Sequence, residues 1–246
     1  MRDPRWRKVL RDLWGNKTRT ILVVLAIAVG IFAFGSVFIT REVLLADLSA
    51  QYRSINASTI TIGIPSFEDS LVRWVRHQEQ VADAQGRAMR RVRLLRGNQA
   101  YNVELYAFDD YENIQVNRIS VEKGTWPPRK RDILFERASI PLTGAQIGDT
   151  VVIELPNGRQ HELKVAGTVH DLRAIPASIW PEISGYVSLE TMEWLGFPYA
   201  YNQLEIVAQD EFDSRAKLEG LADGLKEKLE HKGFSVGSTS VREPGE

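Results

Sequence analysis

The chain has 246 residues, of which 43% are hydrophobic and 26% charged, so wholesale disorder is excluded and one large or two small domains can be built. Cysteine is absent, which excludes a disulfide framework, a thiolate metal site and a cysteine nucleophile. The net charge of −1 is unevenly spread: residues 1–20 carry seven basic and two acidic groups, a net of +5, which leaves −6 for all the rest.

Residues 1–19 are predicted to form an amphipathic helix lying in the membrane interface on the cytoplasmic side. Apolar residues recur there at the spacing of one helical face, while the other face is basic. Tryptophans at the headgroup level are typical of such helices. The residues expected to anchor this part at the interface are Trp6, Leu10, Leu13, Trp14 and Arg19. A charged, frayed tail is the alternative interpretation.

Residues 20–41 are predicted to be a transmembrane helix. The run from 21 to 40 contains no charge and lies between Arg19 and Arg41. Twenty residues span about 30 Å as a helix, which matches the hydrocarbon core. A cleaved signal has a shorter apolar region and a small-residue cleavage site, and a soluble core helix would show regular polar positions. Because basic flanks stay inside, we expect a cytoplasmic N-terminus and an extracytoplasmic location after residue 41.

Small side chains recur within this span near helical spacing. A face of small residues lets another transmembrane helix approach closely. The predicted helix-packing face comprises Ala26, Gly30, Ala33 and Thr40. Its partners would be other transmembrane helices, either of the same protein or of a second copy.

The outer region reads as α+β. Residues 42–56 are predicted to continue the span as a stalk helix, followed by a strand at 58–64 and a helix at 66–81. Two further strands meet at a hairpin turn signal, Gly97-Asn98.

Residues 109–200 are predicted to be an inserted, β-rich part. Its clearest feature is a hairpin at 151–169, and a strand with a short helix follows at 184–196. A strand after residue 200, a helix at 210–233 and a last strand then resume the pattern of the earlier part. The outer region is therefore expected to be a split α+β unit, 57–108 and 201–241, interrupted by this insertion.

The sequence contains no phosphate loop, zinc-protease or serine-hydrolase motif, and we expect no cofactor or metal. His161 and His170 are nine residues apart on one predicted strand, so they face opposite ways and do not suit a shared metal. The basic residues at 87–96 are interpreted as a solvated strand face rather than a nucleic-acid surface, because the domain is net acidic.

An apolar loop at 171–183 is the candidate partner surface outside the membrane. Apolar residues in an exposed loop often mark a contact with another protein. The residues concerned are Ile175, Ile179, Trp180 and Ile183. The alternative is that the loop folds back onto the core.

Two stretches of the sequence resemble FtsX-like and MacB-like ABC transporter permeases. The first is "LRDLWGNKTRTILVVLAIAVGIFAFGSVF", and the second is "GTWPPRKRDILFERASIPLTGAQIGDTVVIELPNGRQHELKVAGTVHD". The resemblance implies a porter-like α+β subdomain with an inserted β subdomain, and residues 242–246 would be a linker toward a second span. It also implies that the chain is the N-terminal part of a permease.

The resemblance implies a protein of the bacterial inner membrane that is not an enzyme by itself. Its expected partners are the bilayer, an ABC ATPase subunit and an extracytoplasmic protein, but no nucleic acid. It would couple ATPase action to its outer domain for export or mechanotransmission. The alternative hypothesis is a stand-alone, single-pass sensor or binding module.

Overall fold

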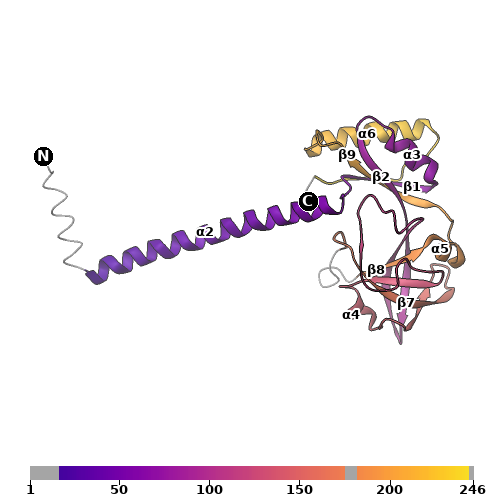
Figure 1. Ribbon diagram of the computed structural model, residues 1–246, viewed down its shortest axis with the longest axis horizontal. Helices are drawn as coiled ribbons and strands as arrows, with labels where there is room; N and C mark the ends of the chain where they lie inside the picture. The colour runs from indigo at the N-terminus through magenta and orange to yellow at the C-terminus, as the bar shows by residue number, and fades with distance from the viewer. Residues whose placement is uncertain (1–16, 175–181, 244–246) are drawn as a thin grey trace. The chain divides into compact units, whose positions relative to one another are not determined.

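The computed structural model describes residues 17–174 and 182–243, and the chain divides after Ser49 into two units that are described separately. Helix α2 runs without a break from Lys17 to Ser54 (Figure 1). Its residues Lys17–Val43 are long and apolar enough to cross a membrane. Their large apolar side chains are exposed, for example Phe32 by 75% and Phe34 by 77%. A helix in the core of a soluble domain would bury such side chains. This is the N-terminal apolar helix that the sequence predicts.

The second unit contains a four-stranded antiparallel sheet covered on one face by two helices. The strand order is β10-β1-β9-β2, and helix α3 follows β1 while helix α6 follows β9. This connectivity is the split βαβ arrangement of ferredoxin-like folds. The elements are β1 (Ile60–Phe67), α3 (Asp69–Arg76), β2 (Val81–Arg96), β9 (Tyr201–Ala208), α6 (Arg215–His231) and β10 (Ser238–Val241).

Alternating apolar residues explain why this layer forms. Ile60, Ile62 and Ile64 on β1 are each at most 2% exposed, because they point to the face that α3 and α6 cover. Helix α6 contributes apolar side chains at helical spacing to the same core. These are Leu218, Leu221, Ala222, Leu225 and Leu229.

The inserted part is built, in the described chain, on a closed ring of six strands, which we call the barrel. Their order is β2-β3-β8-β5-β7-β6, and the ring closes because β6 pairs with both β7 and β2. Strand β4 is added to the side of β7. The elements are β3 (Gln99–Phe108), β4 (Ser120–Gly124), β5 (Asp132–Glu136), α4 (Ile140–Thr143), β6 (Thr150–Glu154), β7 (Gln160–His170), β8 (Ile183–Ser188) and α5 (Leu189–Leu195).

Strand β2 belongs to both sheets. Its residues 81–87 pair with β9 in the four-stranded sheet, and residues 88–96 pair with β3 in the barrel. The sequence groups the β2–β3 hairpin with the α+β unit, whereas in the structure the paired residues 88–108 lie in the barrel. The reason is that one uninterrupted strand of 16 residues is long enough to serve two sheets in succession.

The chain leaves α2 through a turn that is held by the inserted part. The carbonyl of Ile55 accepts a hydrogen bond from the Arg118 amide at 2.9 Å, and that of Asn56 accepts one from the Asn117 amide at 3.1 Å. The Asn56 side chain donates to the Gln115 carbonyl at 2.9 Å. Asn56 has a φ of 52°, a left-handed conformation that asparagine tolerates better than most residues. The two residues that follow α2 are therefore fixed to the segment 115–118.

The hairpins and the α+β class predicted from the sequence are confirmed. Strand β2 turns into β3 at Gly97, with Arg96 opposite Gln99, and β6 turns into β7 around Gly158. The helix expected at 66–81 is shorter, because β1 continues to Phe67 and α3 starts only at Asp69.

Two glycine-to-alanine substitutions are expected to change stability in opposite directions. Gly97 has a φ of +55°, so alanine there should lower the free energy of unfolding by about 1 kcal/mol. Gly220 lies within α6, so alanine should raise it by about 0.5–1 kcal/mol. An added methyl group meets no atom within 4 Å at either position. Thermal unfolding of the detergent-solubilised chain measures both, and equal shifts of the same sign would contradict the assigned conformations.

Candidate functional site

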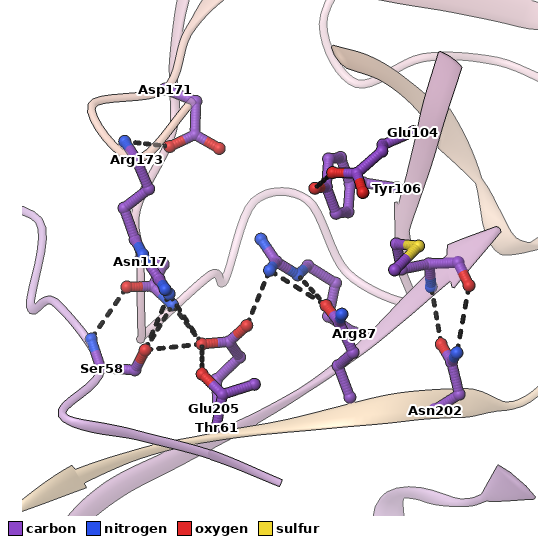
Figure 2. A network of polar contacts seen from close by, with 12 residues as sticks. Ser58, Thr61, Arg87, Glu104, Tyr106, Asn117, Asp171, Arg173, Asn202 and Glu205 are labelled. Carbon is purple, nitrogen blue, oxygen red and sulfur yellow. Dashed lines mark hydrogen bonds and ion pairs between the residues drawn. The ribbon is translucent and has the colours of Figure 1, made fainter. Parts of the chain in front are cut away.

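Glu205 lies at the centre of a buried polar network (Figure 2). The network is on the face of the four-stranded sheet that points away from α3 and α6, where the barrel begins. Leu204 and Ile206 point to the helices, so the alternation of β9 turns Glu205 to the opposite face. That face is covered by segments that come from the insertion. As a result the Glu205 side chain is only 2% exposed.

Two arginines neutralise this carboxylate from opposite directions. Arg87 on β2 donates from Nη2 to Glu205 Oε1 at 2.7 Å, and Arg173 donates from Nη1 to Oε2 at 2.8 Å. Burial by itself raises the pKa of Glu205, but Arg87 and Arg173 outweigh it and lower the pKa to about 2. Burial likewise lowers the pKa of Arg87, and Glu205 reverses the effect, so that this pKa lies above its ordinary value. Glu205 and Arg87 are therefore both charged at neutral pH.

The same carboxylate connects the end of α2 to the network. Glu205 Oε2 accepts hydrogen bonds from Ser58 Oγ at 2.6 Å and from Asn117 Nδ2 at 2.7 Å. The Asn117 side-chain oxygen in turn accepts a hydrogen bond from the Ser58 amide at 2.8 Å. Ser58 follows the turn after α2, and Asn117 comes from the insertion. One carboxylate thus joins the segment after α2, the four-stranded sheet and the insertion.

Two tyrosines extend the network into the barrel, Tyr186 fully buried and Tyr106 partly buried. The Arg87 guanidinium lies over the Tyr106 ring with its Cζ 4.5 Å from the ring centroid, and the Tyr106 hydroxyl donates to Glu104. The Tyr186 hydroxyl donates to Asp171 at 2.7 Å. Burial raises the pKa of both tyrosines, so their hydroxyls remain protonated donors.

A cavity of about 260 Å³ opens beside this network. Its lining is polar and carries charges of both signs. The charged residues are Arg87, Glu104, Asp171, Arg173, Glu182, Glu205 and Arg242. Such a set can hold a small polar molecule. In the described part of the chain no three histidine, aspartate or glutamate residues are close enough together to hold a metal ion.

The predicted membrane residues are described only in part. Trp6, Leu10, Leu13 and Trp14 lie outside the described residues, whereas Arg19 is an exposed residue of α2. The four residues of the expected packing face, which are Ala26, Gly30, Ala33 and Thr40, are also exposed on α2. Their role in helix packing stays a prediction.

One residue of the expected partner loop needs correction. Ile183 is fully buried as the first residue of β8, where it pairs with Val103 in the barrel, so it cannot contact a partner. Ile175, Ile179 and Trp180 lie outside the described residues. A strand start and a loop residue look alike in sequence when both are apolar, which explains the error.

The interpretation of residues 87–96 as a solvated face is wrong for Arg87 and right for three others. Arg91, Arg93 and Arg96 are exposed, but Arg87 is 8% exposed and pairs with Glu205. Sequence reasoning missed Glu205 because an acidic residue at an alternate strand position normally faces water. The available signal was that the partner arginine and this glutamate lie on strands that pair in a split βαβ sheet.

The two histidines of β7 have different surroundings, as the sequence predicts. The His161 ring contacts Trp194 at 4.8 Å between centroids, whereas His170 Nδ1 lies 3.7 Å from a Glu136 oxygen. Asp171 follows His170 but binds Tyr186 instead. His170 and Asp171 therefore do not form a catalytic pair in which the carboxylate would orient the imidazole.

No family model matches the sequence, and no curated protein matches it. The structure is similar to the crystal structure of the periplasmic region of MacB from Actinobacillus actinomycetemcomitans, with 13% identity, a TM-score of 0.45 and coverage of 78% of this chain and 94% of that one. It is also similar to the extracellular domain of the noncanonic ABC-type transporter YknZ from Gram-positive bacteria, with 10% identity, a TM-score of 0.46 and coverage of 74% and 100%.

Replacing Glu205 by glutamine should strongly destabilise the outer domain. The change keeps the shape of the side chain but leaves the buried Arg87 and the partly buried Arg173 without their shared negative charge. Removing one partner of a buried pair costs about 3–5 kcal/mol. Urea unfolding followed by circular dichroism measures the loss, and Glu219→Gln on the exposed face of α6 is the matched control, which should change stability by less than about 0.5 kcal/mol.

The same variant has a characteristic pH dependence. The folded pKa of Glu205, about 2, lies below its ordinary value of 4.5, so its contribution to stability is complete above about pH 5 and is lost as the pH falls toward 2. The difference in unfolding free energy between wild type and Glu205→Gln should therefore narrow over that range. A constant difference from pH 7 to 3 would show that the charge of Glu205 is not what stabilises the network.

Proposed function

We propose that this chain is the N-terminal part of an ABC transporter permease of the FtsX-like and MacB-like kind, and that it couples a cytoplasmic ATPase to an extracytoplasmic domain. The resemblance of the sequence supports the family. The observation that supports the coupling is the segment directly after α2, in which Ile55, Asn56 and Ser58 are hydrogen-bonded into the outer domain.

A coupling element needs a connection that transmits a displacement instead of absorbing it. Flexible glycine-rich linkers would absorb it. Here the residues after α2 make backbone bonds to 115–118, and Asn56 Nδ2 also approaches Asp83 Oδ2 at 3.5 Å. Asp83 pairs with Arg76 at 3.1 Å, so the connection reaches the end of α3. A movement of the helix end would therefore be passed to both sheets.

In this function the N-terminus is cytoplasmic and the outer domain lies outside the bacterial inner membrane. The basic first segment would lie beside the ATPase, anchored by Trp6, Leu10, Leu13, Trp14 and Arg19. The small-residue face of α2 would pack against other permease helices, and the loop around 175–180 would meet an extracytoplasmic protein. Export and mechanotransmission are both compatible with this arrangement.

Purification of the protein from native membranes is expected to yield an ABC ATPase with it. ATP turnover of this complex should fall when Trp14 is replaced by alanine, because the interface anchor beside the ATPase is lost. Tyr199→Ala, an exposed aromatic in the outer domain, is the matched control and should leave turnover unchanged. Absence of an ATPase after gentle solubilisation, or equal turnover in both variants, would refute the proposal.

Replacing Asn117 by alanine should loosen the attachment of the segment after α2 to the outer domain without abolishing ATP hydrolysis. Asn117 bonds Ser58 twice and Glu205 once, so its loss should cost about 1–3 kcal/mol and expose the Ser58 amide to faster hydrogen exchange. ATP-dependent changes in hydrogen exchange of the barrel should disappear in the assembled permease. Asn113→Ala, exposed on the same loop, is the control; a loss of the ATP response in both variants would argue against a specific role of Asn117.

A stand-alone membrane-anchored sensor is the second candidate, favoured by the charged cavity beside Glu205. A sensor would purify without an ATPase and would still bind a ligand. The purification described above therefore separates the two functions.

A further inference from the structure

The cavity beside Glu205 contains buried charges whose hydrogen-bonding capacity is not used up. Arg87 is 8% exposed and uses Nε and Nη2 for Gln203 and Glu205. No described residue accepts a hydrogen bond from its Nη1. Figure 2 shows this nitrogen on the side of the guanidinium away from Glu205, toward the space between Asp171 and Tyr106. Two N–H groups are thus directed into the cavity from a side chain that is only 10% exposed.

Arg173 adds a second cation on the same side. Its Nη1 is occupied by Glu205 and Ser58, while the rest of its guanidinium, with the side chain 13% exposed, also lines the cavity. Two guanidinium groups share one carboxylate, which leaves one positive charge unneutralised by direct contact. An anionic oxygen group placed here would accept charge-assisted hydrogen bonds, and a carboxylate fits a guanidinium well.

The acidic residues of the cavity favour a cationic group on the ligand. Asp171 is 5% exposed and is held by two neutral donors, the Tyr186 hydroxyl and the Arg173 amide, and no described cation forms an ion pair with it. Glu104 binds the Tyr106 hydroxyl and, at 3.3 Å, the exposed Arg91. Both carboxylates can accept further hydrogen bonds from a cationic group.

The sum of the charges decides between ligand classes. Three arginines and four carboxylates line the cavity, a formal sum of −1. A simple anion would increase this negative charge, and a simple cation would leave the Arg87 N–H groups without an acceptor. A molecule with one group of each sign meets both requirements. The volume of about 260 Å³ lies just below the range of sites for drug-sized ligands, and so suits a smaller molecule.

We propose that this cavity binds a small free zwitterion with a carboxylate and an ammonium group, the chemistry of an α-amino acid. The carboxylate would be held by Arg87 and Arg173, and the ammonium group by Asp171 and Glu104. Because the cavity adjoins the contacts that Ser58, in the segment after α2, makes with Glu205 and Asn117, the ligand would stabilise these contacts. This inference stands whether the chain works in a permease or as a sensor.

The test is a binding screen of the full chain in detergent against the twenty L-amino acids, by calorimetry. We expect at least one to bind with a Kd below about 1 mM. Its deaminated and its decarboxylated analogues should each bind at least about tenfold more weakly, because each lacks one charged group. The proposal is overturned if no amino acid binds at about 10 mM, or if either analogue binds as well as its parent amino acid.

Two tryptophan substitutions on β10 locate the binding. Ser240 is exposed at the edge of the cavity opposite Thr61, so Ser240→Trp should block entry and abolish binding. Thr239→Trp lies on the other face of the strand and should leave the Kd unchanged. Glu104→Gln keeps the cavity open and should weaken the amino acid about tenfold but not its deaminated analogue. Unchanged binding in both Ser240→Trp and Glu104→Gln would place the ligand elsewhere and refute the assignment.

Discussion

The outer domain depends on one buried carboxylate between two guanidinium groups. A charge at this depth is unfavourable unless it is paired and fully hydrogen-bonded, and Glu205 meets that condition through Arg87, Arg173, Ser58 and Asn117. Each partner comes from a different part of the chain. The segment after α2, the strand shared by both sheets, the turn after β7 and the insertion must all be in place before the charge is compensated. Pairing at Glu205 therefore requires the correct assembly of the domain and makes its parts interdependent.

Much of the fold follows from local patterns in the sequence. The apolar run of α2, the alternation in β1 and the turn signals at Gly97 and Gly158 each act within a few residues, so composition and spacing reveal them. The sequence does not reveal that β2 passes from one sheet into the other. A long strand has the same alternation whichever partners it has, and only the pairing with β9 and then β3 distinguishes its halves.

The candidate site was far less accessible from the sequence. Arg87 lies in a cluster of arginines, most of which are solvated, and nothing local marks it as different. Glu205 and Arg173 are separated by 32 positions and Ser58 by 147 from Glu205, so their meeting depends on tertiary structure. The face of a two-layer α+β sheet that no helix covers is usually wet, so a glutamate is ordinary there. The insertion changes this by covering that face, and a polar strand position becomes a buried charge.

The closed ring of barrel strands has a consequence for behaviour at high local concentration. A ring has no free edge, so in the described part of the chain the open edges are β10, β4 and the segment 81–87 of β2, which pairs only with β9. Strand β10 presents Ser238, Thr239 and Ser240, and β4 is short and carries Glu122 and Lys123. Small polar and charged residues on short outer strands discourage the addition of a strand from another molecule. Copies crowded side by side at a membrane surface therefore have little tendency to merge their sheets into aggregates.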